Sequence, residues 1–222
     1  MSARTPAAAR TRRAPARRTT AARRRRTAVR RRRMAIGVGL VLVAAAAATL
    51  LSPTGERAVR ELALPLRHDD IVRQQAADKD LDPALIAAVI YAESHFRNGQ
   101  TSSAGAIGLM QVTPATARDI ARRSGGTTFV TGDLHDPQVN ISYGSYHLRY
   151  LIDHFGGNEA FAVAAYNAGE GNVDRWIAEA RVQGRELSPA AIPFPETRAY
   201  VEKVRVAREQ YRDSYAAELG LD

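Results

Sequence analysis

One glutamate of this sequence lies where a helix would bury it. Three apolar residues precede Glu93 at helical spacing, namely Ile86, Val89 and Ile90. Glu93 therefore shares the apolar face of the predicted helix. Burial without an ion partner disfavours the charged form and raises the pKa of a carboxyl group, so Glu93 is a candidate proton donor near neutral pH. The alternative is a glutamate at the rim of its helix that reaches water or pairs with an arginine.

Two loops rich in small residues follow, and each carries an amide side chain. Residues 102–111 end in Gln111, and residues 165–171 contain Asn167 with glycines at 169 and 171. Small residues let a ligand approach the backbone closely. An amide both donates and accepts hydrogen bonds, as recognition of a sugar hydroxyl or acetamido group requires. An ordinary glycine-rich connection is the alternative for each loop.

Four motifs occur in a fixed order along residues 68–215. They are ES at 93–94 with GLMQ at 108–111 and TPATA at 113–117; DP at 136–137 with Asn140 and Gly144; AYNAG at 165–169; and IPF at 192–194 with ETR at 196–198 and YV at 200–201. This set resembles the soluble lytic transglycosylase (SLT) domains, which are relatives of goose-type lysozyme. Each motif alone is weak evidence, but four in order at compatible spacing identify the sequence as a member of that family.

The resemblance implies an all-α, lysozyme-like domain with a groove for the MurNAc-GlcNAc strands of peptidoglycan. It implies that Glu93 protonates the glycosidic oxygen and then takes the proton of the MurNAc O6 hydroxyl, which attacks C1 and forms a 1,6-anhydro ring. An internal nucleophile at high effective molarity removes the need for the second carboxylate of an ordinary glycosidase. The other acids considered are Glu170, Asp174 and Glu196, and none looks placed to act as a nucleophile.

The resemblance also implies a substrate-binding set, which comprises Ser102, Met110, Gln111, Tyr166, Asn167 and Tyr200. Ser102 and Gln111 would line the groove beside Glu93. Met110 and Tyr166 would form its walls, with plain core packing as the alternative. Asn167 would bind the substrate or Glu93. Tyr200 would orient the Glu93 carboxylate through a hydrogen bond.

Helices with recognisable ends would position these residues. Asp-Pro or Thr-Pro pairs at 82–83, 113–114 and 136–137 are N-caps followed by proline at the first helical position. We expect the first of these helices to end near residues 98–99 and the third at the glycine pair 156–157. Further helices are predicted for residues 159–166, 173–180 and 200–215. Only residues 127–131 have a strand-like composition, so the folded domain, residues 67–222, is predicted to be almost all α.

Positive charge is concentrated at the N-terminal end of the chain. Residues 1–33 hold 14 of the 32 basic residues and no acid, which leaves 18 basic and 23 acidic side chains on the other 189 residues. The large apolar residues of this segment are limited to Val29, so we expect a disordered tail. A nucleic-acid arm would have the same composition.

An apolar segment follows the tail. Residues 34–51 contain no charged side chain and are close to the minimum length for a membrane-spanning helix. The preceding arginines would keep the tail in the cytoplasm and place the catalytic domain outside the membrane, with residues 52–66 as a linker. The alternative is a cleaved signal peptide, which would leave a secreted domain. Because of this segment, we expect a membrane partner and no specific nucleic-acid partner.

Metal and thiol chemistry are not indicated. The chain has no cysteine, and its five histidines lack metal-binding spacing, so neither a metal nor another cofactor is predicted. Two other functions remain open within the same groove. One is a hydrolytic lysozyme in which water replaces the O6 hydroxyl, and the other is a glycan-binding protein that has lost turnover.

Overall fold

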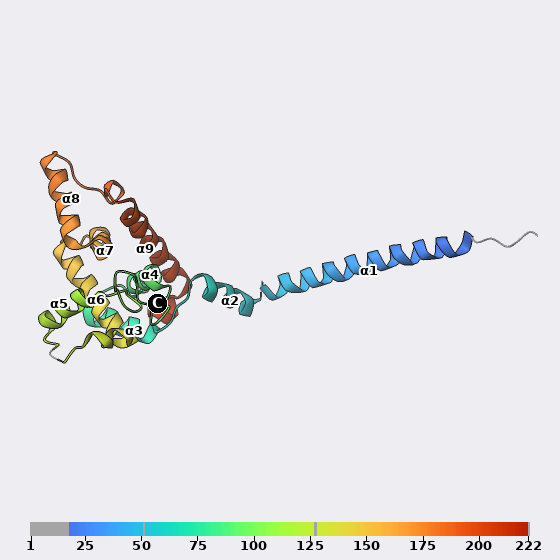
Figure 1. The fold of residues 1–222 in the computed structure, drawn as a ribbon, viewed down its shortest axis with the longest axis horizontal. Coiled ribbons are helices and arrows are strands. Elements are labelled where there is room, and N and C mark those ends of the chain that lie inside the picture. Colours follow the sequence, from blue (N-terminus) through green and yellow to red (C-terminus); the bar gives the residue numbers. More distant parts are fainter. Residues whose placement is uncertain (1–17, 51, 127, 222) are drawn as a thin grey trace, which may run out of the picture. The chain divides into compact units, whose positions relative to one another are not determined.

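The computed structural model describes residues 18–50, 52–126 and 128–221. It divides the chain into two compact units, Met1–Val59 and Arg60–Asp222. The N-terminal unit contains helix α1, Arg18–Leu50, and the start of helix α2, Pro53–Ala63 (Figure 1).

Helix α1 corrects the prediction of a disordered tail for residues 18–33. Arginine and alanine are strong helix formers, and residues 18–36 contain neither proline nor glycine. A lack of large apolar residues excludes a hydrophobic core, but it does not prevent a single helix from forming. Helix α2 likewise occupies much of the predicted linker at residues 52–66. Residues 1–17 of the predicted tail lie outside the described residues.

The apolar part of α1 presents its side chains outward. Within the described residues, no helix is long and apolar enough to cross a membrane, so the spanning helix predicted for residues 34–51 is not found among them. Large apolar side chains in this part are more than half exposed; they are Met34, Ile36, Val38, Leu40, Val41, Leu42 and Val43. Leu51 lies outside the described residues.

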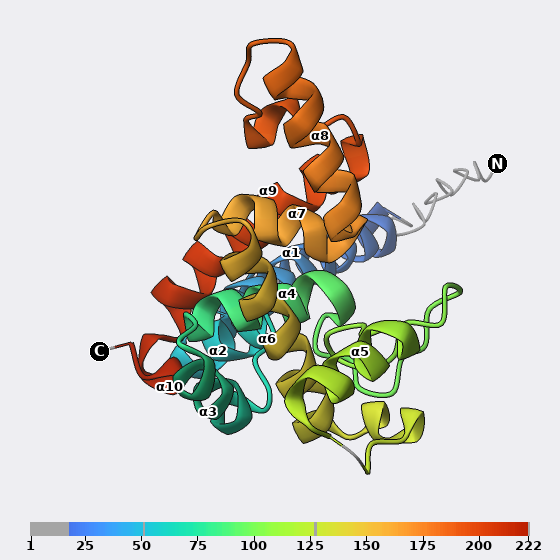
Figure 2. The ribbon, with the colours of Figure 1, turned by 90° about the vertical axis from the view of Figure 1, so that its left-hand side faces the viewer.

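The C-terminal unit is helical, as predicted. Its elements are α3 (Asp69–Lys79), α4 (Pro83–Ser94), α5 (Pro114–Ser124), the 3-10 helix η1 (Thr131–His135), α6 (Pro137–His154), α7 (Glu159–Ala168), α8 (Glu170–Val182), the 3-10 helix η2 (Pro189–Ala191), α9 (Pro195–Ser214) and α10 (Ala216–Leu219). Figure 2 shows α6 passing between α5 and the α7–α8 pair. The sequence patterns did not indicate α3 or α10.

The strand-like composition of residues 127–131 does not produce a strand. Residue 127 lies outside the described residues, residues 128–130 are irregular, and residue 131 already begins η1. Between residues 18 and 221, the β-type pairing described is confined to isolated bridges that join Ile107 to Thr101 and to Val112. A short segment without a neighbouring strand cannot form inter-strand hydrogen bonds, so a strand-like composition is not sufficient for a strand here.

Helix α4 forms the centre of this unit. Every residue from 84 to 90 is buried, and α4 packs most extensively along α9. The helix ends at Ser94, earlier than predicted, because His95 and Phe96 adopt left-handed backbone angles with φ of 52° and 57°. Phe96 is 1% exposed, so the early turn carries this ring into the core. Glu93 is therefore in the last turn of a helix that is apolar on all sides rather than on one face.

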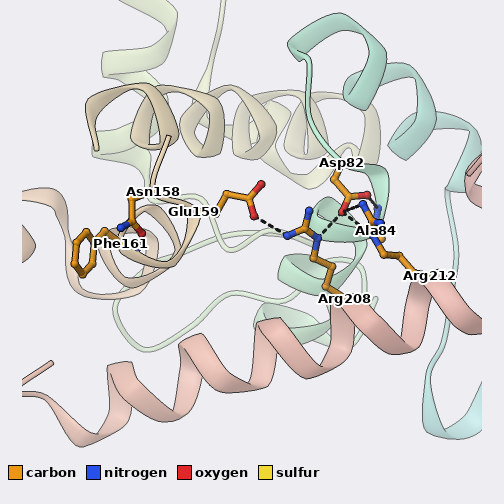
Figure 3. Close-up of polar contacts among 7 residues, drawn as sticks. All are labelled: Asp82, Ala84, Asn158, Glu159, Phe161, Arg208 and Arg212. Atoms are coloured by element: carbon orange, nitrogen blue, oxygen red, sulfur yellow. Dashed lines mark hydrogen bonds and ion pairs between the residues drawn. The ribbon is translucent and has the colours of Figure 1, made fainter. Parts of the chain in front are cut away.

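A polar network fixes the other end of α4 (Figure 3). Asp82 caps the helix by accepting a hydrogen bond of 3.0 Å from the Ala84 N–H, and its side chain is only 9% exposed. From α9, Arg208 and Arg212 both bind the Asp82 carboxylate. Arg208 also bridges to Glu159 at the start of α7, with Nη1 at 2.6 Å from Oε2. The start of α4 thus contacts the C-terminal half of α9, so the two helices run antiparallel.

Candidate active site

Glu93 is joined to the N-terminal half of α9. The Tyr200 hydroxyl donates a hydrogen bond of 2.6 Å to Glu93 Oε1, which is the contact predicted for this pair. Tyr200 is 9% exposed, and Glu93 is half-buried. Burial and the adjacent negative charge of Glu93 raise the pKa of Tyr200 well above its usual range. The tyrosine therefore stays protonated and acts as a donor that holds one carboxylate oxygen in place.

A lysine also contacts the end of α4. Lys203 Nζ donates a hydrogen bond of 3.0 Å to the carbonyl oxygen of Ala92, and it lies 5.4 Å from the ring centroid of Tyr91. Burial raises the pKa of the Glu93 carboxyl above its usual value. The Tyr200 hydrogen bond and the positive charge of Lys203 oppose that rise. Glu93 is thus a partly desolvated acid whose ionised form has two compensating neighbours.

The loop at residues 98–112 is held by its own polar side chains. Ser102 Oγ accepts a hydrogen bond of 3.0 Å from the Ala106 N–H. Gln111 has a left-handed backbone with φ of 49°, and its Nε2 donates to the carbonyl oxygen of Gly108 at 2.8 Å. Both predicted groove residues are half-buried, and the contacts given for them lie within the loop rather than with Glu93.

Asn140 and Tyr166 tie this loop to the helices. The Met110 N–H donates to Asn140 Oδ1 at 2.8 Å, and Asn140 Nδ2 donates to the carbonyl oxygens of Ile107 and Leu134, both at 2.8 Å. The Tyr166 hydroxyl donates to the Met110 carbonyl oxygen at 2.9 Å. One buried amide and one phenol therefore fix the backbone of the GLMQ segment.

Met110 and Tyr166, both predicted to be groove walls, differ in exposure. Met110 has an exposed fraction of 0%, and it fills the space over Gly144, so it packs in the core and presents no surface to a ligand. Tyr166 is half-buried. Burial raises the pKa of Tyr166 well above its usual range, and the nearby charge of Glu93 adds to the effect. Of the two, only Tyr166 retains exposed surface.

Asn167 contacts α9 and not Glu93. Its Oδ1 accepts a hydrogen bond of 2.9 Å from Thr197 Oγ1, and the residue is exposed. This bond joins the end of α7 to the first turn of α9, three residues before Tyr200. Asn167 is thus placed to hold the tyrosine's helix and to present its amide group to solvent.

Sequence reasoning missed three residues of this arrangement: Asn140, Thr197 and Lys203. Asn140 and Thr197 were recognised only as members of motifs, and Lys203 was not recognised at all. Thr197 and Lys203 stand three residues before and after Tyr200, so helical spacing places them on the same side of α9. That spacing was the available signal, and it becomes informative only once Tyr200 is known to face Glu93.

Comparisons with known proteins find relatives over most of the C-terminal unit. The model of the Transglycosylase SLT domain family matches residues 70–188, just over half of the chain. The "Soluble lytic murein transglycosylase" of Escherichia coli (strain K12) is 35% identical over 152 residues, which cover 67% of this chain and 23% of that protein. The "Membrane-bound lytic murein transglycosylase C" of Actinobacillus pleuropneumoniae serotype 5b (strain L20) is 34% identical over 168 residues, which cover 64% of this chain and 44% of that protein.

A solved structure shares the fold. The X-ray structure of an inactive mutant of lytic transglycosylase Slt from Pseudomonas aeruginosa aligns with a TM-score of 0.65 at 33% identity. The alignment covers 71% of this chain and 26% of that chain. The chain thus spans about a quarter of the length of its soluble relatives.

Proposed function

Because the chain belongs to the Transglycosylase SLT domain family, we propose that it is a peptidoglycan lytic transglycosylase that cleaves the MurNAc-GlcNAc bond with Glu93 as its acid and base. Membership of this family and the all-α, lysozyme-like fold confirm the predictions made from the four motifs. The observation that carries the proposed activity is the Glu93 carboxyl, half-buried, with a raised pKa, and held at Oε1 by Tyr200.

The reaction requires one carboxyl group to act twice. Protonated Glu93 gives its proton to the glycosidic oxygen as the bond to MurNAc C1 breaks, and the GlcNAc-bearing fragment leaves as an alcohol. The O6 hydroxyl of the same MurNAc attacks C1, and the Glu93 carboxylate takes the O6 proton. Atoms and protons balance without water, and Glu93 returns to its starting form. Burial favours the protonated state that starts the cycle, and Lys203 favours the ionised state that follows.

The surrounding residues have supporting roles in this proposal. Tyr200 orients the carboxyl group, and Tyr166 holds the Met110 carbonyl oxygen of the GLMQ segment. Ser102, Gln111 and Asn167 supply polar groups for the sugar from loops on either side. Met110 supports the loop from within the core and is not part of the binding surface.

Analysis of the reaction products tests the activity. Wild-type chain and the Glu93→Gln variant are incubated with purified peptidoglycan, and the released muropeptides are weighed by mass spectrometry. We expect 1,6-anhydro products from the wild type and none from the variant. Products one water heavier and reducible at MurNAc would instead establish a hydrolytic lysozyme. Glycan binding by both proteins without any product would establish a binding protein. A solved neighbour is an inactive mutant in which glutamate is changed to glutamine, so the same change here is the informative one.

We also propose that residues 34–51 hold the domain at a membrane, with the N-terminus in the cytoplasm and the catalytic domain outside. The run of apolar side chains exposed on α1 and the arginines that precede it support this proposal. A relative named as a membrane-bound lytic murein transglycosylase supports membrane association as well.

A further inference from the structure

Three tyrosine hydroxyls hold the chain at the end of α2. They donate hydrogen bonds to three consecutive carbonyl oxygens, and the pairs are Tyr91 to Ala63 at 3.3 Å, Tyr215 to Leu64 at 2.8 Å and Tyr211 to Pro65 at 2.6 Å. Tyr91 belongs to α4, Tyr211 belongs to α9, and Tyr215 directly follows α9. A buried tyrosine hydroxyl needs a hydrogen-bond partner, and here the partner is this segment of backbone.

A charged side chain and an apolar side chain fix the same segment. Arg60 Nη1 donates a hydrogen bond of 2.8 Å to the carbonyl oxygen of Ser214, and its guanidinium lies 4.7 Å from the ring centroid of Tyr215. Leu64 is 6% exposed and belongs to the hydrophobic core. We call residues 60–65 the strap. Its contacts are those of a docked segment, which a free linker would lack.

The strap shortens the connection between the domain and the apolar residues 34–51. The compact C-terminal unit begins at Arg60, and α2 runs without a break from residue 53 into the strap at residue 63. The eight residues 52–59 therefore separate the apolar segment from the strap. The family model matches residues 70–188, so the strap lies outside the matched range.

Chain length then limits how far the domain can lie from a membrane that holds residues 34–51. Eight residues span about 12 Å as a helix and about 27 Å when fully extended, whereas a free linker over residues 52–66 could span roughly 50 Å. A domain of about 160 residues is roughly 40 Å wide. With the strap docked, the domain reaches no farther than about 70 Å from the end of the apolar segment.

We propose that the strap is a permanent seat for the chain that leaves the membrane, and that the short tether restricts cleavage to glycan strands close to that membrane. This inference rests on the proposed function and on the proposed anchor at residues 34–51. Strands fixed farther out in the wall lie beyond the reach of Glu93.

Hydrogen exchange tests the strap in the full chain. The double variant Tyr211→Phe/Tyr215→Phe keeps both rings and removes two of the three hydroxyl donors. We expect amide exchange in residues 61–64 to become roughly tenfold faster in this variant. Tyr143→Phe is the matched control on α6, where the ring stacks on Phe129 at 4.9 Å, and it should exchange like the wild type. Unchanged exchange in the double variant would overturn the strap.

Glycan strands held at two heights test the reach. The full chain is placed in vesicles of phosphatidylethanolamine and phosphatidylglycerol, with strands joined to lipid either directly or through a semi-rigid polyproline spacer of about 100 Å. We expect the wild type to cleave the directly joined strands about five- to tenfold faster than the spaced strands. Inserting roughly 40 Gly-Ser residues between Ser52 and Pro53 lengthens the tether without changing the strap, and it should remove most of this difference.

The remaining outcomes separate the restriction from the proposed function. Equal wild-type rates on both kinds of strand would overturn the restriction, as would a difference that the insertion leaves unchanged. If the double variant fails to fold, the insertion decides. If the wild type does not cleave free strands in detergent, the proposed function fails, and hydrogen exchange alone then decides the strap. If the full chain does not enter vesicles, the anchor and the restriction both fail.

Discussion

At the scale of single residues, the state of Glu93 depends on a balance of three influences. Burial raises the pKa of its carboxyl group, whereas the Tyr200 hydrogen bond and the Lys203 charge lower it. A general acid must be protonated to act, so the proposed activity should fall as pH rises through the pKa of Glu93. If Glu93 is the acid, its neighbours on α9 set the upper pH limit of the proposed reaction as well as the position of the carboxyl group.

We predict that Lys203→Met moves the basic limb of the pH–rate profile to higher pH. Without the positive charge, ionised Glu93 is less stable and the pKa of the carboxyl rises. The profile of kcat/KM on peptidoglycan measures this shift. Lys79→Met is a matched control, because Lys79 is the other lysine of the chain and lies on α3. A limb that stays in place or moves to lower pH would contradict the prediction.

A second residue-scale prediction concerns stability. Because the folded-state pKa of Glu93 is raised, its contribution to stability is complete below the unfolded pKa, near 4.5, and is lost as pH rises through the folded value. Glu93→Gln cannot ionise, so its Tm relative to the wild type should rise across this interval and then level off. Each kcal/mol by which the variant is stabilised relative to the wild type corresponds to a rise in Tm of roughly 2–4 °C for a domain of this size. Glu196→Gln, an exposed change on α9, is the control, and a Tm difference independent of pH would sink the idea.

At the scale of elements, the antiparallel pair of α4 and α9 positions the active site from both ends. Tyr200 and Lys203 hold the last turn of α4, and Arg208 and Arg212 hold its first turn through Asp82. A change at the Asp82 end should reach Glu93 only through the packing between the two helices.

We predict that Arg208→Ala lowers the free energy of unfolding by about 2 kcal/mol, because it removes a partner from the largely buried Asp82 and from Glu159. Thermal and denaturant unfolding measure the loss. Arg205→Ala is the matched control one turn away, since Arg205 pairs with Glu202 and Glu209 at the exposed surface. An equal loss in both variants would show that the Asp82 network has no special importance.

The contact between Gly144 and Met110 gives another element-scale prediction. A Cβ atom at position 144 would collide with Sδ and Cβ of Met110, so Gly144→Ala should cost about 1–3 kcal/mol of stability and displace the GLMQ segment. Adding Met110→Ala makes room, and the double variant should be less destabilised than the sum of the two single changes. Additive effects in a double-mutant cycle of unfolding free energies would contradict this packing.

The elements also show what sequence alone can predict. Asp82, Thr113 and Asp136 each cap a helix as expected, because the cap is a local contact between a side chain and the next turn. The early end of α4 was not predictable, since it depends on where the core accepts Phe96. The Glu93–Tyr200 bond joins residues 107 positions apart, and the family resemblance rather than spacing anticipated it. Lys203 escaped notice because nothing local marks a lysine that faces another helix.

At the scale of the whole molecule, the two units differ in composition. Residues 1–33 carry only positive charge, α1 then exposes a run of apolar side chains, and the remaining unit carries the site. Such an apolar run is unfavourable in water and favourable in lipid. The proposed anchor would keep the catalytic domain close to its polymer while leaving the domain's own fold unchanged.

Deleting residues 34–51 tests this arrangement. We predict that the full chain, expressed in a bacterium, sediments with membranes and resists alkaline washing, because leaving the bilayer would return the apolar run to water. The deletion variant should appear in the soluble fraction and cleave purified peptidoglycan at the wild-type rate. Removing residues 2–17 is the control and should leave membrane association intact.

Protease added to spheroplasts tests the orientation of the chain, and it should degrade the catalytic domain of the full chain. Recovery of the full-length chain in the soluble fraction would rule out the membrane anchor. It would also rule out release of the domain by cleavage of a signal peptide.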